Sequence, residues 1–331
     1  MIIPFFLLFD PFGFAVSPVS IVSVSLAAWF YMRGLRRPVR IRGTISVWRP
    51  ILFFAGLACI LAAMNAPLAV MGHTLFSIHQ VEHLLLRLIG PLLIAVSQPW
   101  RILLSSLERR RRQHFSAPAN SRGQSFLAHP TAATGLIVGA LFIWQVPVIY
   151  ALAQRIAAIE VFAHLGMVLA GLWFFTMLFD PRDPPVGAKR GARLLSAFVV
   201  IVANIFLGSL TTLKEVSLYA FSHRERIGLI DALSDETIGG YTIWVPSSMV
   251  MIVAIILVMN GWDAAEVRRW NTRYDLLRGS NSAALEFPET AEELRLKVAK
   301  TNRDMGRTLA IGALVMFLIV ITTVVTIVYA L

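Results

Sequence analysis

The sequence predicts an all-α fold, a polytopic bundle of about eight transmembrane helices. Of the 331 residues, 57% are hydrophobic and 15% are charged, compared with about 45–50% and about 25% in soluble domains. The hydrophobic residues are gathered in separate runs, each close to the ~20 residues that cross a bilayer as a helix. The runs lie at residues 14–32, 50–70, 75–97, 131–149, 159–179, 194–213, 238–260 and 308–330.

The composition of the ends and linkers divides the chain into three parts. The first residues, MIIPFFLLFDPFGF, carry no basic start and no small-residue cleavage site, so we expect an interfacial lead-in rather than a removable signal peptide. The only cysteine, Cys59, lies in the second run, where we expect it to fill space in the core. Residues 263–307 are charged. We expect them to form a partly helical cytoplasmic linker between a membrane bundle at 1–262 and an additional transmembrane helix at 308–331.

The basic residues indicate how the helices are oriented. The net charge is +11, and four stretches carry 25 of the 30 Lys and Arg residues. Those stretches are 33–49, 101–122, 182–193 and 268–307. Loops rich in Lys and Arg stay in the cytoplasm, so we expect these segments on the inner face and both chain termini on the outer face. The positive charge therefore marks topology and contact with anionic lipid heads, and it does not predict nucleic-acid binding.

Two predicted spans carry pairs of ionisable residues, which are costly in lipid and therefore indicate function. His79 and His83 are four residues apart in the third run, and Glu160 and His164 have the same spacing in the fifth. Residues at i and i+4 share one face of a helix. Both pairs follow closely on the start of their runs, so we expect them at one depth in the outer leaflet. Three imidazoles and a carboxylate suit copper or zinc, and the pattern predicts a metal site.

Several neighbours of these pairs extend the predicted site. Near its mouth, Met71, His73 and Met167 would offer softer or transient ligands, as passage of Cu(I) requires. Glu82 lies on the adjoining flank and would accept a hydrogen bond from one imidazole. Arg87 continues the histidine stripe one turn deeper, so we expect it to face the bundle opposite a carboxylate. The alternative for Glu82 and Arg87 is a buried structural ion pair.

The stretch His79–His83 also reads H-x-x-E-H, a zinc peptidase signature in which the glutamate is the general base. A membrane-embedded zinc hydrolase using Glu82 is therefore one alternative. The signature belongs to soluble α/β proteins, whereas this stretch lies in a predicted membrane span, so we favour a protein that is not an enzyme. A second alternative is a carrier of haem b, with one histidine from each helix ligating the iron.

Four motifs in order resemble the CtaG-type cytochrome c oxidase assembly factors, a family of multi-span bacterial membrane proteins. The motifs are "SIHQVEHLLLRLIGPLLIAVSQPWRILL" at 77–104, "WQVPVIYALAQ" from Trp144, "HLGMVLAGLWF" from His164 and "DETIGGYTIWVP" from Asp235 to Pro246. The resemblance covers roughly residues 8–262. It implies a core of seven spans, to which the run at 308–330 adds one more.

The resemblance implies a protein of the bacterial cytoplasmic (inner) membrane that takes part in maturing a haem-copper oxidase. It would receive copper from a periplasmic donor and supply it to an oxidase subunit. His79, His83 and His164 match family histidines and carry over as copper ligands, and Asp235 matches a motif aspartate that could assist them. The chain departs from the family pattern at four positions. Gln80 and Glu82 stand for the usual Met and Gln, Arg87 for an apolar residue, and Glu160 for a histidine found in many members.

Overall fold

A computed structural model of the chain describes the parts of the molecule that carry the predicted site. It describes residues 17–36, 46–106, 129–180, 182, 187–219, 230–277, 303–312, 314–316, 318–319 and 322. These residues form helices and connecting loops, with no strand among them, so the all-α prediction is confirmed for this part of the chain.

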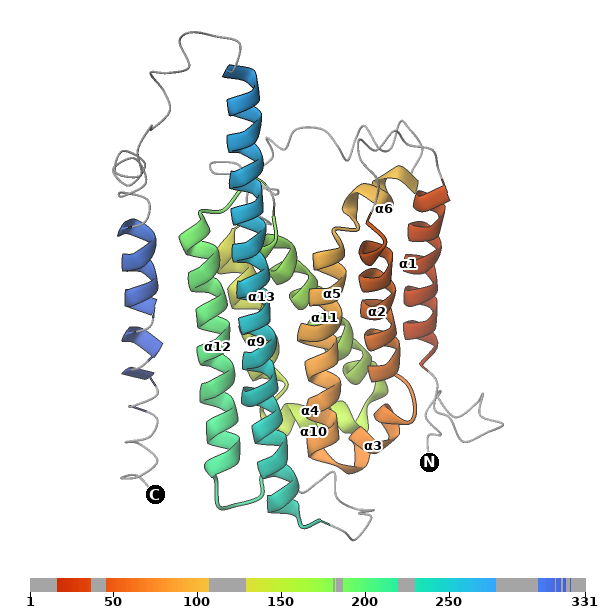
Figure 1. Cartoon of the computed structure of the whole chain (residues 1–331). Coiled ribbons are helices and arrows are strands. Elements are labelled where there is room, and N and C mark those ends of the chain that lie inside the picture. The colour runs from red at the N-terminus through yellow and green to blue at the C-terminus, as the bar shows by residue number, and fades with distance from the viewer. Residues whose placement is uncertain are drawn as a thin grey trace.

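The helices follow the chain in a single bundle (Figure 1). Their bounds are α1 (Pro18–Arg36), α2 (Trp48–Ala63), α3 (Leu68–Thr74), α4 (Phe76–Leu84), η2 (Leu85–Ile89), α5 (Gly90–Ser97), α6 (Trp100–Ser106), α9 (Pro130–Ile143), α10 (Pro147–Arg155), α11 (Ala157–Leu178), α12 (Arg190–Leu213) and α13 (Ala232–Leu277).

The number of membrane spans among the described residues is five, or up to seven if each of two bent helix pairs counts as one span. The continuous spans are α1, the α4–η2–α5 helix, α11, α12 and α13, and the bent pairs are α2 with α3 and α9 with α10. The predicted eight are therefore not confirmed. Of the eighth run, 308–330, the structure describes residues 308–312, 314–316, 318–319 and 322, and these are helical.

Prolines explain why two of the predicted runs are bent. Helix α2 ends at Ala63, and α3 resumes after Pro67 at an angle of 43°. Between α9 and α10 the bend is 77°, and Val146, which precedes Pro147, is extended. Proline disfavours the α conformation in the residue before it and has no N–H to continue the helical hydrogen bonds. The runs at 50–70 and 131–149 each contain such a break.

The third span contains a π turn, η2, where Pro91 interrupts the α-helical bonding. Since Pro91 has no N–H, the carbonyl of Arg87 loses its helical donor. That carbonyl lies against α11 at Gly171, where an added Cβ would come within 2.2 Å of the oxygen. Glycine therefore allows α11 to cross the third span at close range.

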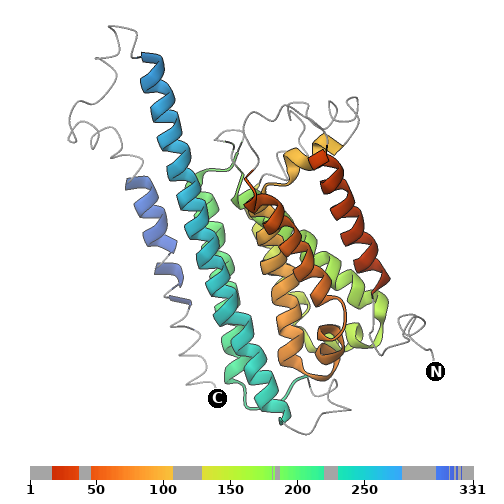
Figure 2. The ribbon, with the colours of Figure 1, turned by 45° about the vertical axis from the view of Figure 1, so that its right-hand side comes forward.

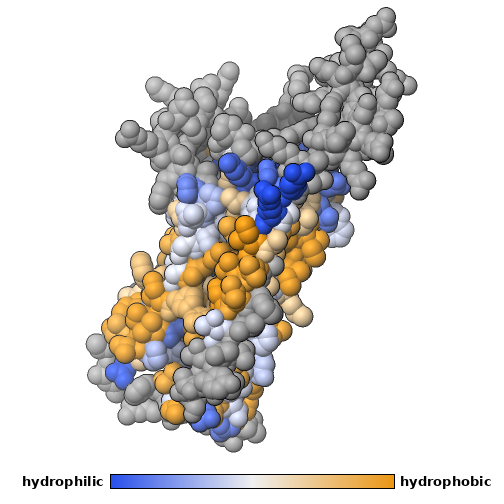
Figure 3. Space-filling view, turned by 90° about the vertical axis from the view of Figure 1, so that its left-hand side faces the viewer, coloured by the Kyte–Doolittle hydropathy of each residue, from blue (hydrophilic) through white to orange (hydrophobic). Residues whose placement is uncertain are grey.

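The third span is the central helix of the bundle. Its apolar window is 72% buried, whereas that of α1 is 17% buried. Figures 1 and 2 show the third span surrounded by the other helices, with α1 at the periphery. The face of the molecule drawn in Figure 3 carries apolar side chains over its middle, with hydrophilic groups above and below them, as expected of a surface that faces lipid.

Helix α13 is longer than the predicted seventh span. It continues to Leu277, into the predicted linker 263–307, and its C-terminal part extends beyond the rest of the bundle (Figure 1). A further helix, α6, follows the third span and enters the predicted cytoplasmic stretch 101–122. Gln98 adopts a left-handed conformation (φ 51°), which ends α5 and redirects the chain into α6.

Candidate metal site

Three buried imidazoles converge from two helices, as the sequence predicts. His79 and His83 lie on successive turns of α4, and their ring centroids are 4.2 Å apart. The ring of His164, from α11, lies 6.4 Å from that of His79 and 6.1 Å from that of His83. All three side chains are buried. The Nε2 atom of His164 has no hydrogen-bond partner among the described residues, so it retains its coordinating capacity.

Glu82 supports this cluster from the adjacent flank of α4. Its Oε2 lies 3.1 Å from Nδ1 of His79. The carboxylate packs on α3 at Gly72, where an added Cβ would meet Oε1 at 2.3 Å. A carboxylate at Nδ1 fixes the tautomer that carries its proton there and leaves Nε2 as the coordinating atom.

Glu160 pairs with His73 and not with His164, although its i, i+4 spacing suggested a pair with His164. Its Oε1 lies 3.2 Å from Nε2 of His73, whose Nδ1 lies 2.5 Å from Oε1 of Gln154. The His73 side chain is 43% exposed. These three residues therefore form a polar group at the mouth of the site. Met71, also near the mouth, is exposed on α3.

Arg87 faces the bundle, but the side chain opposite it is an amide and not the expected carboxylate. Its Nη2 donates to Oδ1 of Asn204 on α12 at 2.8 Å, and its Nη1 has no partner among the described residues. Asn204 is itself held by a hydrogen bond from Nδ2 to the Val200 carbonyl. The prediction of a buried ion pair at Arg87 is wrong in this part of the molecule, because the residue of α12 that faces it is neutral.

Asp235 binds backbone and hydroxyl groups at the start of α4. Its carboxylate accepts hydrogen bonds from the Phe76 N–H at 2.7 Å, from the Ser77 N–H at 3.1 Å and from the Ser77 hydroxyl at 2.6 Å. The first N–H groups of a helix have no partner within the helix. Asp235 of α13 therefore caps the helix that carries His79 and His83.

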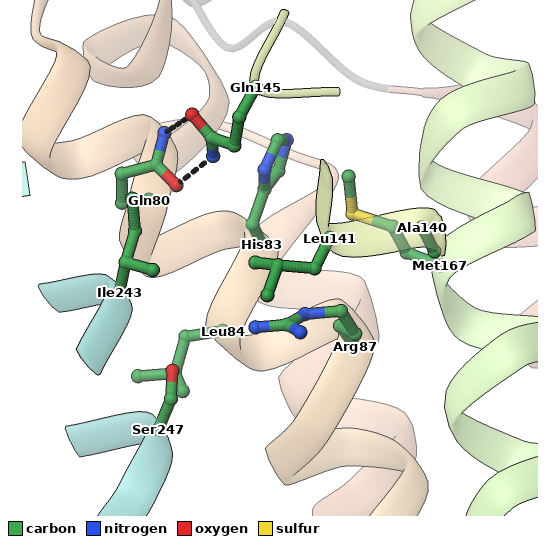
Figure 4. Close-up of a pocket in the computed structure, with 10 residues that line it drawn as sticks. All are labelled: Gln80, His83, Leu84, Arg87, Ala140, Leu141, Gln145, Met167, Ile243 and Ser247. Carbon is green, nitrogen blue, oxygen red and sulfur yellow. Dashed lines mark hydrogen bonds between the residues drawn. The ribbon is translucent and has the colours of Figure 1, made fainter. Parts of the chain in front are cut away.

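Three polar residues of the site were not predicted as site residues from the sequence, although two of them lie inside the family motifs. The amides of Gln80 and Gln145 are hydrogen-bonded to each other, at 2.5 Å and 3.4 Å (Figure 4). The Tyr219 hydroxyl donates to the Gln145 carbonyl at 2.6 Å. Gln145 reaches this position because the α9–α10 bend places it between the two helices. The "WQVP" motif was the available signal for that bend.

Glu236, next to Asp235, organises the segment between α12 and α13. It accepts hydrogen bonds from the Leu218 and Tyr219 N–H groups at 3.0 Å each, and it also contacts the Ser217 hydroxyl and the Lys214 ammonium. Tyr219 is thereby placed with its ring stacked on Phe76, 4.4 Å between centroids. Burial raises the pKa of Tyr219 to about 12. This segment covers the histidine end of α4.

The donor atoms do not stand in the arrangement of a formed metal site. Among the described residues, no group of three or more His, Cys, Asp or Glu side chains could hold a metal ion in its present positions. Met167 of α11 is buried and lines a cavity that His83 also lines (Figure 4). The cluster thus brings three imidazoles close together, but not in positions in which all three could hold one ion.

The fold and the site together define a polytopic helical membrane protein with a buried three-histidine cluster shared by two spans. The chain belongs to the cytochrome c oxidase caa3 assembly factor (CtaG) family, whose model matches residues 29–264. The matched range includes every residue of the candidate site. The family resemblance drawn from the motifs is confirmed.

Relatives of the chain are found in mycobacteria. A Mycobacterium leprae protein is 23% identical over 249 residues, which are 72% of this chain and 38% of that protein. Proteins of Mycobacterium bovis and Mycobacterium tuberculosis are 23% identical over 265 residues, 77% of this chain and 39% of each. All three are described as uncharacterized. The chain thus spans about two fifths of the length of these relatives. No solved structure matches it.

Proposed function

We propose that this chain assists the assembly of a haem-copper oxidase by holding a copper ion and passing it to an oxidase subunit. The observation that carries the proposal is the convergence of His79, His83 and His164 in the buried interior of the bundle. In this proposal copper is the cargo and the protein is not an enzyme. The oxidase as partner follows from the family.

The chemistry of the three side chains suits copper. Imidazole is a ligand that copper accepts, and a nitrogen binds such an ion at about 2.0–2.1 Å. Glu82 leaves Nε2 of His79 available, and Nε2 of His164 has no other partner among the described residues. The ring separations of 6.1 and 6.4 Å mean that His164 must approach the other two rings to share one ion. An arrangement that needs this movement favours release of the ion over permanent storage.

The residues at the mouth supply a route for the ion. His73 and Glu160 lie 3.2 Å apart, and His73 is partly exposed, with Met71 on the same short helix. We propose that these side chains receive the ion from a donor on the periplasmic side and transfer it inward. Glu160 would thus act before the histidine cluster rather than within it. Asp235 would act indirectly, through the position of α4.

Copper analysis of the purified full chain tests the proposal. We expect about one copper ion per wild-type chain and a loss of at least about tenfold in affinity in the His79→Ala/His83→Ala variant. His129→Ala is the matched control, because His129 is an exposed residue at the start of α9, bonded to Thr131, and should leave binding unchanged.

Two outcomes would reject the proposal. Wild-type protein that binds no copper would remove the ligand role. A deletion strain whose oxidase kept its full copper content would remove the assembly role. A Soret band that disappears in His164→Ala would instead identify the histidines as ligands of haem b.

A further inference from the structure

Arg87 is a buried cation whose charge no described side chain balances. It is 3% exposed and lies in the π turn of the central span. Arginine remains protonated in proteins. A buried charge without a counter-charge costs several kcal/mol, so such groups are normally paired. The only hydrogen-bond partner of its guanidinium in the described part of the chain is the Asn204 amide, which carries no charge.

The buried carboxylates among the described residues have neighbours other than Arg87. Glu82 lies against His79 and Gly72, Asp235 caps α4, and Glu236 holds the segment before α13. Glu160, which is partly buried, pairs with His73 at the mouth. None of them makes a salt bridge with Arg87, so the charge is left for a group that the chain does not provide.

The guanidinium lines a cavity that has the chemistry of an anion site. In Figure 4 it extends beneath His83 toward the side of the cavity where Leu84 and Ser247 lie. Its Nη1 has no hydrogen-bond partner among the described residues, and the Ser247 hydroxyl is on the same cavity wall. The rest of the wall is mixed: His83 and the amides of Gln80 and Gln145 line it together with apolar side chains such as Leu141 and Met167.

We infer that this cavity binds one small monovalent anion, with Arg87 as its counter-charge. One guanidinium balances a single negative charge, so a divalent oxyanion would bring excess charge. The cavity is small, and Arg87 and the Ser247 hydroxyl can donate to a compact monovalent anion such as chloride. The site follows from this chain's own residue, because the family pattern resembled by the sequence has an apolar side chain at position 87. The inference does not depend on copper binding.

Equilibrium dialysis with radioactive chloride tests the site in the purified full chain, in buffer whose other anion is gluconate. We expect saturable binding of about one chloride per wild-type chain, since the cavity has a single cation, and displacement by bromide or nitrate. Arg87→Leu should abolish it. Arg182→Leu is the matched control, because Arg182 is an exposed arginine that pairs with Asp180, and it should bind as the wild type does.

A second variant covers the case in which Arg87→Leu does not fold. Arg87→Lys keeps the charge but lacks the planar fork of donors, so we expect chloride binding about tenfold weaker than in the wild type. Gel filtration and thermal unfolding of each variant report its folding. Absence of saturable chloride binding in the wild type, or equal affinity in wild type, Arg87→Lys and Arg87→Leu, would overturn the inference.

Discussion

At the scale of single residues, the polar side chains around α4 divide between supporting the helix and facing the histidines. Asp235 and Glu236 are neighbours in the chain but serve different segments, one the start of α4 and the other the segment that carries Tyr219. Both carboxylates accept hydrogen bonds from backbone N–H groups, so they hold the structure around the histidines without belonging to the cluster.

Tyr219 gives the protein a dependence on alkaline pH. Its pKa is raised to about 12 by burial, above the ~10 of an unfolded chain. Between these values the unfolded state loses its proton first, so stability is full below pH 10 and falls by roughly 2–3 kcal/mol as the pH rises toward 12. In detergent, thermal unfolding of the Tyr219→Phe variant should not show this loss of stability between pH 10 and 12.

The difference in stability between the wild type and Tyr219→Phe should change with pH. At pH 8 the wild type should be more stable by about 1 kcal/mol, because Tyr219→Phe loses the hydrogen bond to the Gln145 carbonyl. The difference should shrink and reverse above pH 10. Lys214, whose Nζ lies 4.7 Å from the ring centroid, is present in both proteins, so its own titration largely cancels. Parallel stability curves from pH 8 to 12 would contradict this assignment.

At the scale of helices, the crossing of α11 over the third span determines how close His164 comes to the other histidines. Gly171→Ala places a Cβ 2.2 Å from the Arg87 carbonyl oxygen, so the helices must separate. We expect a destabilisation of about 1–3 kcal/mol, measured by thermal unfolding in detergent, together with weaker copper binding.

Gly166 on the same helix is the matched control for this substitution. An added Cβ there meets nothing within 4 Å. Gly166→Ala should therefore be neutral or stabilise the helix by up to about 1 kcal/mol. Equal destabilisation by the two substitutions would contradict the assignment of the effect to the close crossing at Gly171.

Helix periodicity also sets how much of the site the sequence could predict. The 4.2 Å pairing of His79 and His83 follows from their i, i+4 spacing, and the fifth span supplies His164 as expected. The partners of Arg87 and Glu160 could not be predicted, because they depend on the rotation of α12 and on the bend before α3. The close approach of α11 at Gly171 likewise depends on how two helices pack, which the sequence of the third span alone does not contain.

At the scale of the whole molecule, the distribution of basic residues predicts which end of the bundle faces the cytoplasm. The composition predicted the all-helical membrane fold, and α13 shows that a helix need not end where its apolar run ends. Its apolar run ends near residue 260, but the helix continues to Leu277 through charged residues. Hydropathy reports where lipid begins and ends, whereas a helix continues as long as its backbone hydrogen bonds do.

Labelling at the two ends of α12 tests this orientation. In a Cys59→Ser background, Lys189→Cys and Glu215→Cys place single exposed thiols just before and just after the helix. A membrane-impermeant maleimide added to intact spheroplasts should label Glu215→Cys and spare Lys189→Cys until the membrane is permeabilised. The reverse pattern would invert the proposed topology and move the histidine cluster to the cytoplasmic side.

The cap that Asp235 places on α4 links the site to the order of synthesis. Asp235 follows Ser77 by 158 positions, so α4 leaves the ribosome long before its capping carboxylate exists. During that interval the first N–H groups of α4 must be satisfied by other partners. The hydrogen bonds from Asp235 to the start of the helix that carries His79 and His83 can therefore form only after the last core helix has been synthesised.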